Sequence, residues 1–187
     1  MISQQEEYRL SFLDQQPHIR NYARHLTIFP FPDERYTDAA IDALCNGLST
    51  TLQQLPFLAG HLNLSDSKTE SLKLEYTSPM DVVAEAKRIF NASLVVATHP
   101  DYSYDILSQS HFDSSQFPAE VVCPAFLRHH SGLDDGDSYA TGRTSFAKGI
   151  TLPVLATQVA FIPGGLVLSV WIHHCVADGA GVRRIYE

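Results

Sequence analysis

The sequence predicts an α/β protein, and three patterns indicate this class. Between Thr37 and Leu55, apolar residues recur at spacings of three and four, which lays one stripe along an amphipathic helix: Ile41, Leu44, Leu48, Leu52 and Leu55. The segment "SLKLEY" at 71–76 alternates apolar and polar side chains, as a half-buried strand does. Two nearly continuous apolar runs, "PVLATQVAFI" at 153–162 and "LVLSVWI" at 166–172, are typical of adjacent central strands buried on both faces.

Local signals set the boundaries of these elements. Thr37 or Asp38 can cap the helix, and Pro56 stops it. The triplet Pro163-Gly164-Gly165 suits a type II turn between the two apolar strands. In "DVVAEAKRIF" at 81–90, the two valines favour a strand and the residues after them a helix, so we expect a short strand followed by a helical turn. The segment "AGVRRIYE" after Gly179 begins another helix.

The composition is that of a globular domain and excludes several partners. The chain has 187 residues, of which 44% are hydrophobic and 18% charged, and its formal net charge is -8. Nucleic-acid binding depends on clustered Lys and Arg, and only 13 of these are spread along the chain. We therefore expect no nucleic-acid partner and no membrane partner. The N-terminus has neither a basic nor an apolar leader region, so a cytoplasmic protein is expected.

The three cysteines, Cys45, Cys123 and Cys175, are widely separated and odd in number. This pattern fits reduced thiols better than a disulfide framework or a zinc site.

Two similar strings of histidine, aspartate and glycine stand out: "HHCVADG" at 173–179 and "HHSGLDDG" at 129–136. The first follows a buried strand, where successive side chains point to opposite faces, so only one of its histidines can enter a given cavity. An imidazole with a pKa near neutrality can act as a general base toward a hydroxyl or amine. The second lies among turn formers, and its polar residues are expected in a solvated loop: His129, His130, Asp134 and Asp135.

Two other interpretations of His173, His174 and Asp178 stay open on the residues alone. A hydrogen-bonded structural cluster is the ordinary explanation of an isolated H-x-x-x-D pattern. A metal site is the other, because His and Asp bind divalent cations, but the sequence shows no third ligand at a recognisable spacing, so no metal is expected.

The string "HHCVADG" has the form HHxxxDG and resembles the signature of the coenzyme A-dependent acyltransferase superfamily. The preceding "PVLATQVAFIPGGLVL" strengthens this resemblance, as do "LSFLDQ" at 10–15 and "LSTTLQQLPFLAGHL" at 48–62. Within the superfamily the chain is most similar to BAHD-type acyltransferases, particularly the fungal branch of trichothecene O-acetyltransferases. The resemblance implies a chloramphenicol-acetyltransferase-like fold, with a mixed β-sheet and flanking helices.

The same resemblance implies roles for four residues. His174 would be the general base, Asp178 a structural support whose carboxylate pairs with an arginine, His173 a supporting residue, and Gly179 a spacer beside the channel. Acyl-CoA would be the co-substrate, with no tightly bound cofactor, and a small-molecule hydroxyl or amine would be the acceptor. We expect Cys175 to be a small packing residue rather than a nucleophile.

The sequence departs from the family in length. Full BAHD-type enzymes have a second domain that carries a D-F-G-W-G motif, and this sequence contains no such motif. Residues 1–187 are therefore expected to form a single N-terminal domain ending shortly after HHxxxDG, which could self-associate or pair with a C-terminal half. A chloramphenicol-acetyltransferase-like trimer and a non-catalytic remnant or interaction module are the alternatives; condensation domains share the signature but sit in longer synthetases.

Overall fold

The computed structural model describes residues 4–66, 68, 70–95, 102–128, 130–131 and 150–186. Within them the strands form two four-stranded sheets. The first sheet has the order β1 (Gln4–Tyr8), β4 (Ser71–Ser78), β3 (His61–Asp66) and β6 (Leu152–Pro153). The second has the order β2 (Tyr22–Pro30), β8 (Gly165–His173), β7 (Leu155–Ile162) and β5 (Phe90–Leu94).

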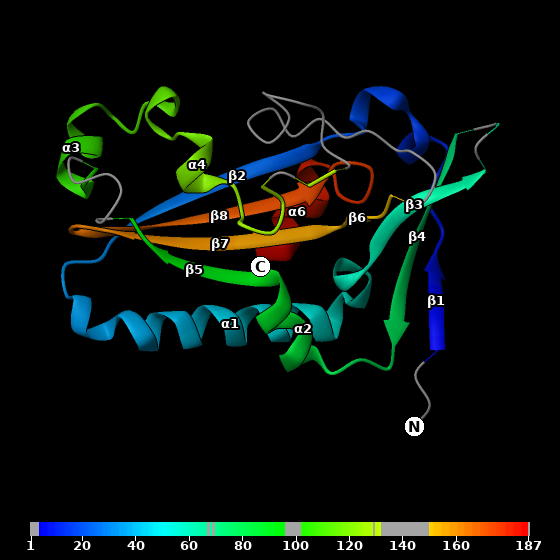
Figure 1. Cartoon of the computed structure of the whole chain (residues 1–187), viewed down its shortest axis with the longest axis horizontal. Coiled ribbons are helices and arrows are strands. Elements are labelled where there is room, and N and C mark those ends of the chain that lie inside the picture. Colours follow the sequence, from blue (N-terminus) through cyan, green and yellow to red (C-terminus); the bar gives the residue numbers. More distant parts are fainter. Residues whose placement is uncertain are drawn as a thin grey trace.

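The second sheet is mixed and central. β5 pairs with β7 in parallel, whereas β7 with β8 and β8 with β2 are antiparallel. In Figure 1, the long helix α1 (Thr37–Gln54) and α2 (Val82–Ile89) lie along one side of this sheet, and α3 (Tyr104–Gln109) and α4 (Ala119–Val122) lie on the other. The last helix is α6 (Gly179–Tyr186). The predicted mixed α/β fold with flanking helices is thus confirmed, and a second sheet is added to it.

Strands β7 and β8 form the core of the molecule, as the two apolar runs predict. Every residue of β7 is buried, and so is every residue of β8 except Leu168. One face, which includes Leu155 and Ile172, packs with α1 and α6, and the other, which includes Ala160 and Val167, packs with α3 and α4. The predicted turn between them is also found, because Gly164 has a φ of 76°, which a type II turn requires at this position.

Helix α1 occupies nearly the predicted range, but its predicted cap is wrong. The residue before the helix is Tyr36, which makes no capping hydrogen bond. Instead Asp33 caps the 3-10 turn Glu34–Tyr36 that leads into α1, and the Thr37 hydroxyl donates to the Glu34 carbonyl at 2.7 Å. A preceding 3-10 turn supplies backbone partners at this end, so the helix begins without a side-chain cap.

The order of elements in 81–94 is the reverse of the prediction. Residues Val82–Ile89 are a helix, and the strand Phe90–Leu94 follows it. The Asp81 carboxylate accepts hydrogen bonds from the amides of Val83 and Ala84, and so caps the helix. The cap and the burial of Ala86 and Ile89 outweigh the strand preference of the valines in the first turn.

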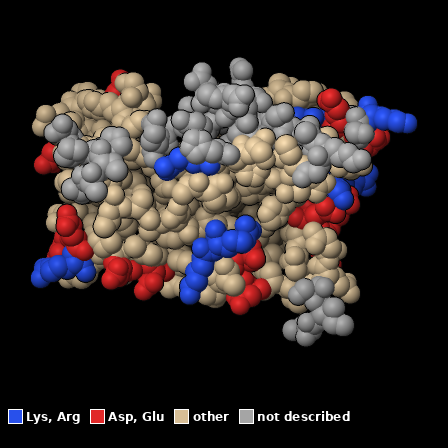
Figure 2. Space-filling view, in the orientation of Figure 1, with Lys and Arg blue, Asp and Glu red and all other residues tan. Residues whose placement is uncertain are grey.

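Charged side chains of both signs lie on the outer surface of the layer formed by α1 and α2. Figure 2 shows acidic and basic groups close together along the lower edge of this face, over α1 and α2. One such pair is Glu85 and Arg88, whose carboxylate and guanidinium are 2.7 Å apart on α2. No helix in the described part of the chain is long and apolar enough to cross a membrane.

Candidate active site

The HHxxxDG string forms the end of β8, a turn and the start of α6. Strand β8 ends at His173, and residues 174–176 form the turn. The His173 amide donates to the Val154 carbonyl at 2.9 Å, and the His174 amide donates to the Asn21 carbonyl at 2.8 Å. The two amides thus point to opposite neighbours, as in a continuing strand, and the chain turns away from the sheet directly after them.

His173 is fully buried on the face of the sheet that also carries Trp171. Its ring lies edge-on to the ring of Tyr22, with centroids 5.3 Å apart, and Tyr22 is its direct partner across β2 and β8. The Tyr22 hydroxyl donates to the Pro153 carbonyl at 2.5 Å. Burial lowers the pKa of His173 to about 3, with smaller contributions from His174 and Arg20, so the ring is neutral near pH 7.

His174 is only half-buried, in contrast to its neighbour. Its Nδ1 atom is buried and has no hydrogen-bond partner in the described part of the chain. No hydrogen bond to Nδ1 therefore fixes the orientation of the ring within the described part of the chain.

Asp178 immediately precedes helix α6 and caps its first turn. Its Oδ1 accepts a hydrogen bond from the Gly181 amide at 2.8 Å, and its carbonyl accepts one from the Val182 amide. An aspartate at this position satisfies amides that a helix N-terminus leaves free. The side chain thus caps α6, but it makes no ion pair with any described arginine, so the arginine partner that the resemblance implies is not identified.

Gly179 faces open space. A Cβ atom added there would meet no atom within 4 Å, and its φ is not in the left-handed region. Nothing in the surrounding described structure therefore requires glycine at this position.

Cys175 lies fully buried in the turn, between His174 and Asp178 in the sequence. Burial raises the pKa of its thiol to about 12, with a further raising contribution from Asp14. The side chain is therefore a thiol near neutral pH, which agrees with its expected role as a packing residue and not as a nucleophile.

The "LSFLDQ" segment is locally well ordered beside the first sheet. The Ser11 amide donates to the Asp14 carboxylate at 2.7 Å, and the Asp14 amide donates to the Ser11 hydroxyl at 3.3 Å, which is the reciprocal pattern of a capping box. Gln15 binds both the amide and the carbonyl of Leu72 through its side chain. These bonds tie the segment to β4.

The "PFLAG" segment turns the chain sharply after α1. Residues Pro56–Ala59 form a 3-10 turn, and Gly60 follows it. A Cβ atom at Gly60 would lie 2.6 Å from the Glu75 carbonyl oxygen, so only glycine lets β4 approach this closely.

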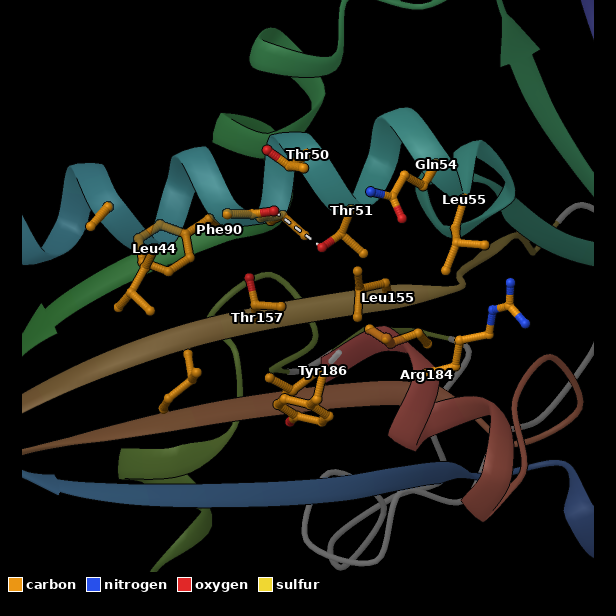
Figure 3. A pocket seen from close by; sticks show the side chains of 16 residues that line it. Leu44, Thr50, Thr51, Gln54, Leu55, Phe90, Leu155, Thr157, Arg184 and Tyr186 are labelled. Carbon is orange, nitrogen blue, oxygen red and sulfur yellow. Dashed lines mark hydrogen bonds between the residues drawn. The ribbon is translucent and has the colours of Figure 1, made fainter.

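A roomy groove lies away from the turn after β8 (His174–Val176), which we call the histidine turn. It has a volume of about 500 Å³ and lies between α1, the sheet and the last turn of α6 (Figure 3). In Figure 3, Leu155 and Thr157 point into it from β7, and Thr51 from α1. None of His173, His174 or Asp178 lines it. Helix α6 connects the two features, because it begins directly after Asp178 and ends in the groove at Tyr186.

The second histidine string lies mostly outside the described residues, which include only His130 and Ser131 of it. His130 is half-buried, its amide donates to the Leu127 carbonyl at 3.0 Å, and burial lowers its pKa. His130 thus lies in a loop, as predicted, but its side chain is half-buried and not fully solvated. The solvated loop stays a prediction for His129, Asp134 and Asp135.

Sequence reasoning missed the residues that hold the histidine turn from outside it. Asn21 and Tyr22 lie far from the turn in sequence, and nothing in their local pattern marks them. They reach the turn only because β2 pairs with β8. The described residues contain no group of three His, Cys, Asp or Glu side chains that could hold a metal ion.

The comparison with known families identifies the class of protein. Residues 22–187 match the model of the trichothecene 3-O-acetyltransferase-like N-terminal domain. The chain belongs to this family of acyltransferases, as its signature and the sequence around it predict.

Several relatives share this sequence over nearly the whole chain. Acyltransferase easC of Emericella nidulans is 28% identical over 184 residues, which are 96% of this chain and 33% of that protein. A trichothecene 3-O-acetyltransferase of Saccharomyces cerevisiae is 24% identical over 96% of the chain and 35% of its own length. The chain thus spans about a third of the length of the curated relatives that it matches.

Solved structures show the same fold. The F. sporotrichioides TRI101 structure, complexed with coenzyme A and T-2, has a TM-score of 0.70 at 22% identity, covering 97% of this chain and 37% of that one. F. graminearum TRI101 complexed with ethyl coenzyme A has a TM-score of 0.73 at 17% identity, covering 98% and 38%. At these identities the likeness establishes the fold of the chain.

Proposed function

We propose that this chain is the N-terminal domain of an acyltransferase that moves an acyl group from acyl-CoA to a hydroxyl or amine of a small molecule. The observation that carries the proposal is the HHxxxDG turn at the end of a buried central strand, in a chain of the trichothecene 3-O-acetyltransferase-like family. Relatives whose structures contain coenzyme A support acyl-CoA as the co-substrate. Fungal relatives, and the mycotoxin complex of F. graminearum TRI101, support a place in fungal secondary-metabolite biosynthesis.

In the proposed mechanism His174 is the general base. The half-exposed ring removes the proton from the acceptor O–H or N–H through Nε2, since Nδ1 is its buried nitrogen. The acceptor attacks the thioester carbonyl, and a tetrahedral intermediate forms. Its collapse breaks the C–S bond and expels the CoA thiolate, which takes the proton from the His174 imidazolium. No covalent acyl-enzyme is involved.

The other site residues support this base. His173 lies buried and neutral next to it, and Asp178 caps α6 shortly after the turn. Open space at Gly179 is consistent with a spacer beside a channel. Because these residues lie at one end of the sheet, we propose that residues 1–187 act as one domain and that the remaining walls of the site come from a C-terminal half or from another copy.

The test is release of free thiol from acetyl-CoA and malonyl-CoA by the purified chain, with a panel of small alcohols and amines. The chain is assayed alone and mixed with the separately expressed C-terminal portion of a longer relative such as easC. Acceptor-dependent release with an acylated product in the mass spectrum would support the proposal. A folded chain that is silent in both assays would contradict catalysis and favour a non-catalytic remnant or interaction module.

The oligomeric state discriminates the other alternative. A chloramphenicol-acetyltransferase-like trimer would complete each site with a neighbouring subunit, so light scattering would give three times the mass of one chain. A monomer that becomes active only with the C-terminal portion would instead support the two-domain arrangement.

A further inference from the structure

We infer that Cys175 is a positioning residue, which sets the place of His174 by locking the side chain of His173 over the turn. The inference rests on the proposed role of His174 as the base. It adds a function for a buried thiol that the proposed chemistry does not use.

The contact between the two side chains is direct. The Nδ1 atom of His173 lies 2.9 Å from the Cys175 sulfur and 3.4 Å from the Cys175 amide nitrogen. Since Nδ1 accepts the amide hydrogen, it carries no proton, and the ring proton of neutral His173 lies on Nε2. The S–H group of Cys175 is then a second donor to Nδ1. One imidazole nitrogen thus holds both the backbone and the side chain of Cys175.

This pair is held rigidly from two sides. Both side chains are fully buried, and the Tyr22 ring lies against the edge of the imidazole while its hydroxyl is bonded to Pro153. The amide of Val176 donates to the His173 carbonyl at 2.9 Å, which closes the turn on itself. A well-packed and hydrogen-bonded cluster of this kind permits few alternative conformations.

His174 lies between the two locked residues and has no comparable restraint of its own. Its amide is bonded to Asn21, but its buried Nδ1 has no hydrogen-bond partner among the described residues. Its ring position therefore depends on the turn, and the turn depends on the contact between His173 and Cys175. Loss of the thiol should allow the ring of His174 to move, although Cys175 itself touches no substrate.

Two substitutions at Cys175 remove the S–H donor, a third at another cysteine provides the control, and a fourth at Cys175 restores a donor. Cys175→Ala removes the thiol, and Cys175→Val removes it but fills the space. Cys123→Ala removes another fully buried thiol, which lies in the cluster of Tyr22 and Trp171 but whose sulfur contacts the Pro124 carbonyl and not the histidine turn. Cys175→Ser keeps a donor at the same position and should return the site toward the wild-type state.

The primary measurement is a long-range ¹H–¹⁵N correlation spectrum of the histidine rings at constant pH. We expect wild-type His173 to show a proton on Nε2 only. In Cys175→Ala the ring resonances of both His173 and His174 should shift, whereas Cys123→Ala should leave the tautomer of His173 and the resonances of His174 unchanged. If the alanine variant does not fold, the valine variant decides. Resonances of His174 that are the same in the Cys175 and Cys123 variants would overturn the inference.

Kinetics provide the second measurement. A displaced base should lower kcat by about tenfold or more and leave KM for acyl-CoA nearly unchanged, because the loss falls on the transition state. Equal kcat values for the Cys175 and Cys123 variants would also overturn the inference. A wild-type chain without activity would count against the proposed function, and the spectra would still decide whether Cys175 positions His174.

Discussion

The histidine turn and the groove between α1 and the sheet differ in empty volume, in packing and in hydrogen bonding. The groove is roomy, with a volume of about 500 Å³, and is lined by apolar side chains such as Leu155, Leu168 and Val170. The turn is compact, and its backbone and side chains are joined by hydrogen bonds to Val154, Asn21 and within itself. A large cavity therefore does not mark the place where this chain has groups suited to acid–base chemistry.

The two regions should also differ in how much free energy of unfolding is lost when a side chain is truncated. At the turn, side chains are tightly packed around a hydrogen-bonded backbone. Substitutions there should therefore lower the free energy of unfolding strongly. At the groove, the side chains have empty space on one side and have fewer contacts to lose. Substitutions of matched size in the two regions test this contrast.

The largest difference is expected between Ile172→Ala and Leu168→Ala, which remove the same number of carbon atoms. Ile172 is fully buried beside the turn, so its truncation should cost about 3–5 kcal/mol of unfolding free energy. Leu168 is partly exposed on the groove side, so its truncation should cost only about 1–2 kcal/mol of unfolding free energy. Urea denaturation measures both values. Equal losses would break the distinction between a packed and an unpacked region.

The second prediction concerns acid. The pKa of His173 is lowered in the folded chain to about 3, below its ordinary value of 6.5, so between these pH values the unfolded chain binds a proton that the folded chain does not. Stability should therefore be highest above pH 6.5 and fall by about 1.4 kcal/mol per pH unit in this window through His173 alone. His173→Gln should flatten this part of the stability curve. An unchanged slope would mean that His173 is not held neutral by burial.

A smaller effect is expected at the start of α6. Asp178→Ala removes the acceptor of the Gly181 amide and should cost about 1 kcal/mol, whereas Asp178→Asn keeps an acceptor and should cost only a few tenths. Thermal unfolding compares the two variants. A loss as large in the asparagine variant as in the alanine variant would show that the charge, and an ion pair of the carboxylate, matters more than the cap.

The smallest effect is expected in the groove and has the opposite sign. Gly47 lies inside α1, and a Cβ atom added there would meet nothing within 4 Å. Gly47→Ala should therefore stabilise the chain by about 0.5–1 kcal/mol, because alanine favours the helix and occupies empty space. Destabilisation in a denaturant titration would mean that the groove is filled in solution.

The sequence predicted the elements whose patterns are local and strong. The stripe in α1 and the run at 166–172 gave nearly the correct ranges, because burial determines these patterns. The run at 153–162 gave β7 from Leu155 onward, but Pro153 belongs to β6 in the other sheet. Residues 81–90 were predicted in the wrong order, since the cap at Asp81 and the burial of Ile89 outweigh local propensity.

In the site, too, local features could be predicted from the sequence and contacts between distant segments could not. The position of His173 at a strand end followed from the sequence, and the resemblance singled out His174. The contacts of Tyr22 and Asn21 with the turn did not follow, because they depend on the pairing of β2 with β8 between distant parts of the chain. The sulfur contact of Cys175 with His173 was also missed, since it depends on the tight turn after the strand.

The central claim is that His174, and not another half-buried histidine, is the base. The most direct test compares His174→Ala with His130→Ala in acceptor-dependent thiol release from acetyl-CoA, under the condition in which the wild-type chain is active. We predict that His174→Ala lowers the rate by about 10²–10⁴-fold at nearly unchanged melting temperature, and that His130→Ala retains the wild-type rate. Equal losses in both variants, or full activity of His174→Ala, would contradict the account.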